Sequence, residues 1–340
     1  MFREDKMDLN ETNLNMSCDV YICKKTAQIL FPMFYIVVFI VSISGNILVL
    51  YVTFQKQQKF NSTTLYLINL AISDTLFALA LPGRITYYIR GFDWPFGDLM
   101  CRLTTVIFYT NTYVGIAFMT CISVDRYFAM VHPHRLVKFR KVEVVKVICG
   151  LVWMMVFLQT APLLFRTLLG KNKDKRTCME YFNFDGSPFL PYLLLAACTI
   201  SFCMPLGIIL GCYSKINLKL SSTARANPMT SRSGRNQRAN NVILLILFTF
   251  VVCFSPYHIN IMQFMMRRIM YVPTCEELKA FKMSLQVTVS IMNINCCLDP
   301  IIYFFAIKTY KQRVLSLFKG YLSTSTFSSK TISDNSSSNS

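Results

Sequence analysis

Ionisable and amide side chains stand inside long apolar runs of this sequence, where burial costs free energy and so points to function. Asp74 lies in the run Leu70-Ala-Ile-Ser-Asp-Thr, and Asp299 lies in another apolar run. Three amides share this setting: Asn46, Asn111 and Asn295. If all five side chains face inward, they form one polar cluster that can hold water or a small cation, such as sodium at Asp74. The alternative is a hydrogen-bonded network that holds no ion.

Groups suited to catalysis are scarce. The three histidines are His132, His134 and His258, and none stands in the His-Glu-x-x-His arrangement that an intramembrane metalloenzyme would use. We therefore expect no enzyme, no cofactor and no metal beyond the sodium candidate. A transporter would be expected to show inverted repeats and discontinuous helices, and the sequence has neither.

The apolar runs are long enough to cross a membrane. Hydrophobic residues make up 54% of the 340 residues and charged residues 15%, whereas a soluble domain carries roughly a quarter charged residues. A helical span takes about 20 mostly apolar residues, and lipid cannot satisfy an open backbone. The sequence predicts an all-α membrane protein, a single seven-helix bundle. The predicted spans are 28–54, 64–89, 100–124, 144–169, 188–214, 237–266 and 281–307.

Basic residues gather in four of the segments that join or follow these spans. They are Lys56, Lys59, Arg135, Lys138, Arg140, Lys141, Lys215, Lys219, Arg225, Arg232, Arg235, Arg238, Lys308, Lys311, Arg313 and Lys319. The positive-inside rule places these segments in the cytoplasm and the N-terminus outside. The glycosylation sequons at Asn10 and Asn15 agree with this orientation in the plasma membrane. The net charge of +18 then indicates attraction to anionic lipid and an acidic partner rather than to nucleic acid.

Five of the 13 cysteines fall on the predicted outer side, where thiols oxidise. A bond between Cys101, at the start of the third helix, and Cys178 would pin the loop after the fourth helix across the mouth of the bundle. Cys18 and Cys275 form a second plausible pair, in which Cys23 could replace Cys18 or remain free. Sequence alone leaves this connectivity open.

The third helix also indicates where the cytoplasmic boundary lies. Cys101 and Arg126 are 25 residues apart, which corresponds to roughly 37 Å along a helix. Asp125-Arg126-Tyr127 therefore stands at the inner boundary of the membrane. Taken alone, this tripeptide is better explained by ordinary interfacial anchoring by Arg and Tyr.

Six motifs on six helices together resemble the rhodopsin-like G-protein-coupled receptors, over residues 28–319. They are Gly45-Asn46, Leu70-Ala-Ile-Ser-Asp74, Asp125-Arg126-Tyr127, Trp153, Cys253-Phe254-Ser255-Pro256-Tyr257 and Asp299-Pro300-Ile-Ile-Tyr303. Phe254 stands where that family usually has Trp, and Asp299 where it usually has Asn. Both departures are similar to the branch whose members bind nucleotides, leukotrienes and other lipids.

The resemblance implies a mechanism. A ligand on the outer side shifts a pre-existing equilibrium, and the sixth helix swings outward at the inner face. Asp125 is expected to hold Arg126 in the resting state, and Arg126 then joins Tyr213 and Tyr303 in the G-protein pocket. Bending or triggering is expected at Pro205, Phe254, Pro256 and Pro300, since proline breaks the helical hydrogen-bond ladder.

The resemblance also implies four regions. These are an extracellular tail (1–27), the bundle (28–307), an amphipathic helix on the inner leaflet (308–319), and a disordered Ser/Thr-rich tail (320–340). Receptor kinases and arrestins are the expected readers of that last tail, and a passive polar tail is the alternative.

The outer half of the bundle combines hydroxyl groups and one guanidinium with many apolar residues, which suits an apolar ligand with a few hydroxyls. Arg84 could instead extend to the lipid headgroups. Longer runs, among them Leu81-Pro-Gly-Arg-Ile-Thr-Tyr-Tyr and Phe108-Tyr-Thr-Asn-Thr-Tyr, are similar to oxysterol receptors of lymphocytes. That resemblance implies a dihydroxylated cholesterol of the 7α,25 type, inhibitory G proteins and directed migration of immune cells. The implied ligand residues are Arg84, Tyr109, Tyr113, Glu180 and Tyr257. The alternatives are a chemokine-like peptide receptor or a receptor for leukotrienes, nucleotides or other lipids.

Overall fold

Seven helices long and apolar enough to cross a membrane are present in the computed structural model, which confirms the predicted bundle. The structure describes residues 24–55, 61–133, 136–165, 168–172, 175–178, 189–226, 234–307 and 310–316. The first three spans are the single helices α2 (Lys24–Gln55), α3 (Ser62–Ile89) and α4 (Gly97–Val131). The fourth consists of α5 (Val142–Thr160) and α6 (Pro162–Phe165). The fifth consists of α7 (Leu190–Cys198), η3 (Thr199–Cys203) and α8 (Met204–Ala226). The sixth comprises α10 (Gly234–Thr249), η4 (Phe250–Phe254) and α11 (Ser255–Met270), and the seventh α12 (Cys275–Met292) and α13 (Asn295–Ala306).

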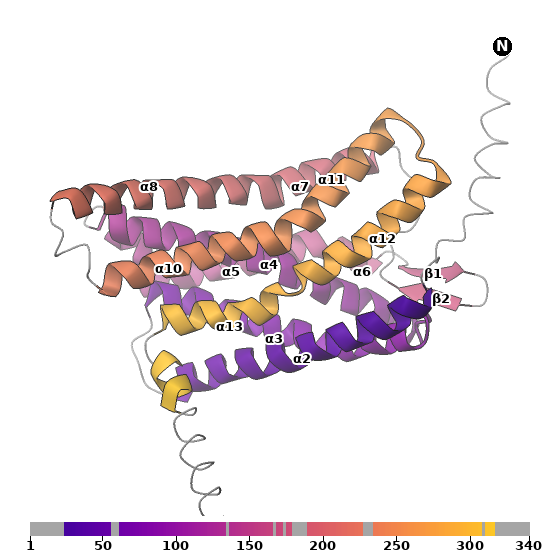
Figure 1. Cartoon of the computed structure of the whole chain (residues 1–340), viewed down its shortest axis with the longest axis horizontal. Coiled ribbons are helices and arrows are strands. Elements are labelled where there is room, and N and C mark those ends of the chain that lie inside the picture. The colour runs from indigo at the N-terminus through magenta and orange to yellow at the C-terminus, as the bar shows by residue number, and fades with distance from the viewer. Residues whose placement is uncertain are drawn as a thin grey trace, which may run out of the picture.

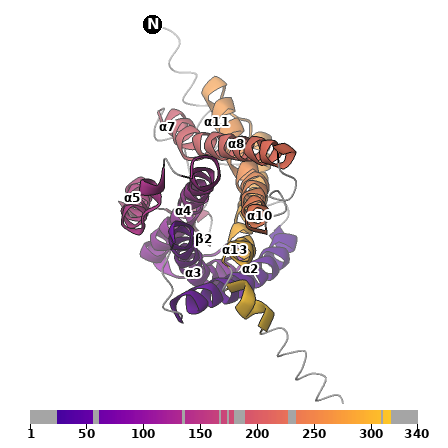
Figure 2. The same ribbon diagram turned by 90° about the vertical axis from the view of Figure 1, so that its left-hand side faces the viewer.

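The helices lie side by side in a ring, with α5 at its periphery (Figures 1 and 2). Burial agrees with this arrangement. Half of the most apolar window in the sixth and in the seventh span is buried, but only 17% of that window in the span that contains α5. Met155 and Leu158 of α5 are 66% and 65% exposed. Because these side chains are apolar, we assign this face to lipid.

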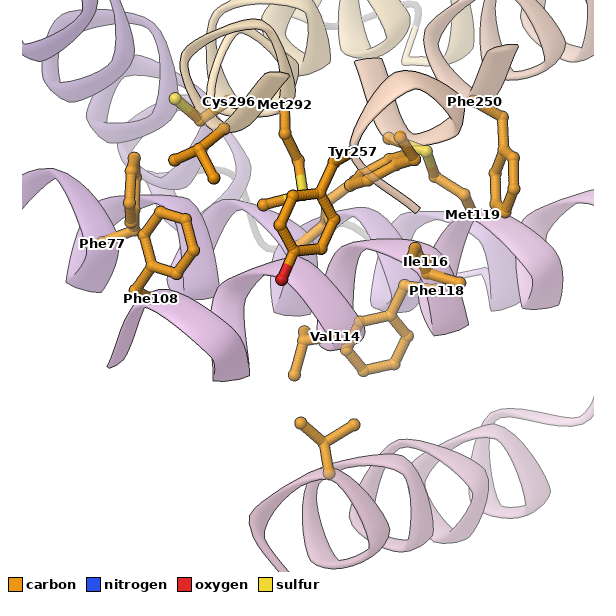
Figure 3. Close-up of a cluster of buried hydrophobic side chains, with 14 of the residues drawn as sticks. Phe77, Phe108, Val114, Ile116, Phe118, Met119, Phe250, Tyr257, Met292 and Cys296 are labelled. Carbon is orange, nitrogen blue, oxygen red and sulfur yellow. The ribbon is translucent and has the colours of Figure 1, made fainter. Parts of the chain in front are cut away.

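One long hydrophobic core fills the inside of the ring, and α4 runs through it. Phe108, Phe118 and Ile122 of α4 are each at most 4% exposed. Figure 3 shows part of this core, where Tyr257 of α11 lies among side chains from α3, α4 and the seventh span. Packing of this kind gives the bundle a rigid frame on which polar side chains can be placed.

A short β-hairpin lies between the fourth and fifth spans, an element that the sequence did not indicate. Strands β1 (Leu169–Asn172) and β2 (Lys175–Cys178) pair antiparallel, with Leu169 opposite Cys178. The fourth span was predicted to continue to residue 169, but α6 ends at Phe165. The charged run that follows cannot lie in lipid, and pairing two strands satisfies its backbone without a helix. We call this end of the bundle the hairpin end, and the opposite end, where Asp125 lies, the Asp125 end.

The fifth, sixth and seventh spans are each interrupted near their middle. A π-helical turn, η3 or η4, comes just before Pro205 and Pro256, the two prolines predicted as bends in the fifth and sixth spans. Proline cannot donate to the helical ladder, and a wider turn accommodates the loss. The seventh span breaks at Asn293 and Ile294, and Pro300 lies inside α13. No pattern in the sequence indicated the break at Asn293 and Ile294.

Residues 310–316 are helical and lie across the Asp125 end (Figure 1). Tyr310 is buried, and the Lys311 ammonium lies 5.2 Å from the centre of the Phe304 ring. The rest of the predicted surface helix and the tail at 320–340 lie outside the described residues, as do Asn10, Asn15 and the tail at 1–23.

Candidate functional site

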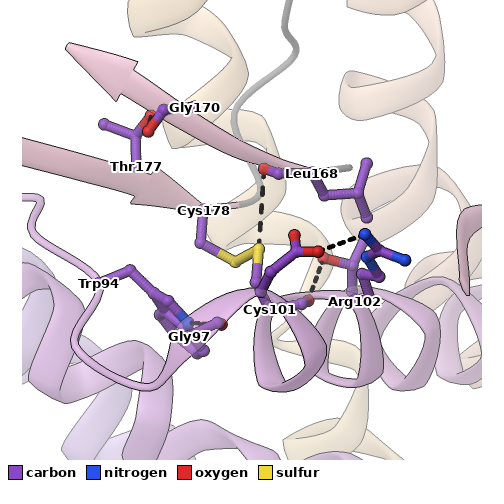
Figure 4. The surroundings of a disulfide bond; sticks show 10 residues. Trp94, Gly97, Cys101, Arg102, Leu168, Gly170, Thr177 and Cys178 are labelled. Carbon is purple, nitrogen blue, oxygen red and sulfur yellow. Dashed lines mark hydrogen bonds and ion pairs between the residues drawn. A yellow bond between two sulfur atoms is a disulfide. The ribbon is translucent and has the colours of Figure 1, made fainter. Parts of the chain in front are cut away.

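The Cys101–Cys178 disulfide ties β2 to the start of α4, as Figure 4 shows. Cys275 is also disulfide-bonded, but its predicted partner Cys18 and the alternative Cys23 lie outside the described residues. The hairpin is therefore fastened across the end of the bundle at a residue of α4, as the sequence predicts.

The loop after α3 holds the other side of the hairpin. The backbone N–H of Arg176 donates to Asp93 Oδ1 at 3.1 Å, and Trp94 N donates to the Arg176 carbonyl at 2.7 Å. The Arg176 N–H, followed by the Arg90 guanidinium, lowers the pKa of Asp93 below its usual value, because both interactions favour the carboxylate. Gly91 permits this turn, since its φ is +68° and a side chain there would collide with Gln28.

Arg84 lies inside the bundle near the hairpin end and is only 7% exposed, which argues against extension to lipid headgroups. Its guanidinium carbon lies 5.3 Å from the ring centre of Tyr35 and 5.1 Å from that of Phe108. Its Nη2 donates to the Tyr88 hydroxyl at 3.1 Å, and that hydroxyl donates to Gln286 Oε1 at 2.8 Å. Four spans thus surround one buried cation with aromatic faces and hydroxyls.

Of the other predicted ligand residues, Tyr109 and Tyr113 are half-buried on α4, and Tyr257 is buried on α11. Glu180 lies outside the described residues. The ring of His258 lies 6.2 Å from that of Tyr113 and 5.0 Å from that of Tyr257. His258, which is not among the predicted ligand residues, thus contacts the rings of both Tyr113 and Tyr257.

His258 is fully buried and stacks on Phe202 with ring centres 4.3 Å apart. Its Nδ1 donates to the Phe254 carbonyl at 2.8 Å, so Nε2 carries the lone pair. Nε2 has no hydrogen-bond partner within the part of the chain that the structure describes. Such an acceptor suits a hydroxyl group that donates a hydrogen bond. The one signal in the sequence that could have indicated His258 is its position directly after Tyr257.

All five residues of the predicted polar cluster are at most 3% exposed. Asn111 Nδ2 donates to Asp74 Oδ1 at 2.8 Å, and the carboxyl groups of Asp74 and Asp299 lie within reach of each other. Asn46 instead donates to the Ser42 and Cys296 carbonyls, at 3.0 and 3.1 Å. Within the described ranges, several buried polar atoms here have no hydrogen-bond partner: Asn46 Oδ1, Asp74 Oδ2, both Asp299 oxygens, Asn295 Nδ2 and the Tyr303 hydroxyl.

At the Asp125 end, the direct ion pair of Asp125 among the described residues is with Arg140, while Arg126 lies close enough to interact with Asp125 electrostatically. Asp125 Oδ1 accepts from Arg140 Nε at 2.8 Å, and Arg126 donates to the Thr63 hydroxyl. The Thr63 hydroxyl lies between the two side chains, because it accepts from Arg126 and donates to Asp125. Tyr213 is half-buried and Tyr303 is buried. Within the described part of the chain, no hydrogen bond or ion pair links either of them to Arg126.

Comparison with known proteins agrees with the arrangement of seven spans. Residues 45–303 match the family described as "7 transmembrane receptor (rhodopsin family)". The chain is 51% identical to G-protein coupled receptor 183 of Rattus norvegicus over 312 residues, which cover 91% of this chain and 87% of the relative. The protein of that name from Homo sapiens is 49% identical, covering 91% and 86%. A G-protein coupled receptor homolog of fowlpox virus is 34% identical, covering 82% and 87%. These relatives are receptors and not enzymes, and the chain belongs to the rhodopsin family of seven-transmembrane, G-protein-coupled receptors.

Proposed function

We propose that this receptor binds a dihydroxylated cholesterol of the 7α,25 type at the hairpin end. It would signal through inhibitory G proteins to direct the migration of immune cells. The hairpin end would face the outside of the cell, and receptor kinases and arrestins would act at the C-terminal tail. The observation that carries the ligand proposal is the burial of Arg84 among aromatic rings and hydroxyls.

The chemistry of this region supports a hydroxylated apolar ligand. Arg84 can donate hydrogen bonds, the His258 ring can accept one, and the surrounding aromatic and aliphatic side chains match a sterol skeleton. Tyr109, Tyr113 and Tyr257 would complete the contacts with the hydroxyls, and Glu180 would shape the loop that closes over them. A nucleotide or leukotriene would favour several inward cations.

The second candidate is a chemokine-like peptide. The disulfide at Cys275 favours it, because a bond to the N-terminal tail would hold the mouth of the bundle open for a protein ligand. The tail itself lacks the acidic and tyrosine-rich stretch that would grip a basic chemokine.

The polar cluster would act in signalling rather than in ligand binding. Asp74, Asn111, Asn295 and Asp299 could hold a sodium ion or a network of hydrogen bonds in the resting receptor. Pro205, Phe254, Pro256 and Pro300 would allow the bending that moves the inner end of the sixth span.

The test is G-protein activation in cells titrated with 7α,25-dihydroxycholesterol. We expect Arg84→Ala to weaken the response by about 1.5–3 kcal/mol, the range for hydrogen bonds to a charged group. Arg84→Lys should lose part of this, since it keeps the charge but not the planar fork. Arg90→Ala is the control, because Arg90 lies on the same helix end and its side chain is 54% exposed.

Surface expression would be measured for every variant. If the wild-type receptor reaches the surface and stays silent, the oxysterol proposal fails, and chemokines and anionic lipids become the ligands to test. If the Arg84 and Arg90 variants respond alike, the hydroxyls bind elsewhere.

A further inference from the structure

A short helical turn between the fourth and third spans reaches into the Asp125 cluster. It is the 3-10 helix η1 (Val137–Arg140), whose last residue places its guanidinium against Asp125. The two side chains are 31% and 3% exposed. The pair is thus buried at the carboxylate and open to solvent at the arginine.

Asp125 of α4 is held by groups from two other elements, α3 and η1. Besides Arg140, it accepts from the Ser62 hydroxyl at 2.5 Å and from the Thr63 hydroxyl at 2.6 Å. Both hydroxyls belong to the first turn of α3, which Asn61 caps by accepting from Thr64 N at 2.8 Å. The cap fixes the donors in place, so Asp125 ties together α3, α4 and η1.

Packing holds η1 in the position that this pairing needs. The Phe139 ring lies 6.1 Å from that of Phe128 on α4, and Lys141 at the end of η1 accepts from Val145 N at the start of α5. Lys138 points elsewhere, with its ammonium 5.5 Å from the Phe139 ring centre. Arg140 is therefore the one described basic residue of η1 that contacts Asp125.

We propose that Arg140 is a positioning residue that restrains G-protein activation by holding Asp125 and η1 together in the resting receptor. Arg126, which the sequence assigns to that restraint, bonds the Thr63 hydroxyl instead. The restraint would therefore join the third span to the segment that follows it, rather than lie within the third span. This inference concerns the inner end of the receptor and does not depend on which ligand binds.

The physical reason is the cost of an unpaired buried charge. Without Arg140, Asp125 keeps two hydroxyl donors but loses its ion pair, which makes the resting arrangement less favourable. A ligand-free receptor would then spend more time in the active state, because a change in free energy between two states changes their populations.

The experiment measures nucleotide exchange on G proteins of each class in membranes without added ligand, at matched surface expression. We expect Arg140→Ala to raise the ratio of ligand-free exchange in the variant to ligand-free exchange in the wild type to roughly three to ten, as fits a partly exposed ion pair. Arg140→Lys should raise this ratio less than Arg140→Ala does. Arg140→Glu should raise it more, because a carboxylate would then face Asp125. Lys138→Ala is the matched control on the same turn and should leave the ratio unchanged.

A double-variant comparison shows whether Arg140 acts through Asp125. In an Asp125→Asn receptor, Arg140→Ala should add little, since its partner is already neutral. Full additivity, an unchanged ratio in Arg140→Ala, or an equal rise in Lys138→Ala would overturn the proposal. If the receptor responds to no oxysterol but Arg140→Ala still raises ligand-free exchange, the Arg140 proposal holds and only the ligand proposal fails.

Discussion

Asp74 and Asp299 place two carboxyl groups close together inside the bundle. Asn111 satisfies one oxygen of Asp74, while both oxygens of Asp299 lack a hydrogen-bond partner within the described part of the chain. Two carboxylates so close in a medium of low dielectric repel strongly unless a cation lies between them or one of them keeps its proton. At the scale of single residues, this pair therefore fits either an ion or a shared proton in the polar cluster.

We predict that Asp299→Asn raises the melting temperature of the purified receptor by about 2–4 °C in choline chloride, because it removes one of two facing carboxyl groups. Sodium chloride at the same ionic strength should stabilise the wild type more than the variant. Equal stabilisation of both proteins by sodium would favour the hydrogen-bonded network without an ion. Asn46→Ala would show whether the nearby amide contributes, since its side chain bonds backbone carbonyls instead.

The loop after α3 and strand β2 stabilise each other at the scale of elements. Among the described residues, hydrogen bonds join them directly from Arg176 N to Asp93 Oδ1, from Trp94 N to the Arg176 carbonyl, and from Lys175 Nζ to the Gly91 and Arg90 carbonyls. The Cys101–Cys178 disulfide fastens the same strand to α4. The hairpin therefore has polar anchors on α3 as well as a covalent one on α4.

The Asp93 anchor should depend on pH. Its pKa is lower in the folded receptor than its ordinary value of 3.8, so it adds stability above pH 3.8 that is lost as the pH falls through the folded value. We expect Asp93→Asn to lower the melting temperature by about 1–2 °C at neutral pH, since the group is partly exposed. The difference from wild type should vanish in acid.

The measurement is thermal unfolding of detergent-solubilised receptor across a pH series. Glu143→Gln serves as the control, because Glu143 belongs to an exposed pair with Lys146 at the Asp125 end and should leave the melting temperature unchanged. A difference between Asp93→Asn and wild type that persists in acid would show that the anchor does not depend on the carboxylate charge.

The first and seventh spans pack against each other at Gly45, where there is no room for a side chain. A Cβ at Gly45 would lie 2.6 Å from Cγ of Pro300, so the two helices touch backbone to ring. Next to this contact, Asn46 donates to the Cys296 carbonyl at 3.1 Å, below the break in the seventh span. At the scale of the whole molecule, this contact fixes how closely α13, which carries Asp299 and Tyr303, lies against α2.

Gly45→Ala should destabilise the receptor by about 1–3 kcal/mol, the usual cost of overpacking, because the proline ring cannot move aside as a flexible side chain would. Gly150→Ala is the matched control, since a Cβ there meets nothing within 4 Å and alanine favours the helix. Thermal unfolding of the two variants checks the prediction. Similar melting temperatures would mean that the seventh span shifts without cost.

The sequence by itself determined the number of spans, the membrane setting and the membership of the family. Long apolar runs leave a chain in lipid few choices, because every backbone polar group must be satisfied within a helix. Charged motifs such as Asp125-Arg126-Tyr127 stand out against this background. Burial of Arg84 and of the five polar residues also followed the prediction, since a polar group that lipid would penalise turns inward.

Only the tertiary structure decided which polar groups meet. Sequence spacing relates residues on one helix, but Asp125 finds Arg140, Ser62 and Thr63 on other elements, and His258 comes between Tyr113 and Tyr257. The hairpin and the break at Asn293 were missed for a similar reason. Both depend on contacts with distant segments, β2 with the loop after α3 and Asn293 with the Tyr35 hydroxyl, and local propensity does not encode such contacts.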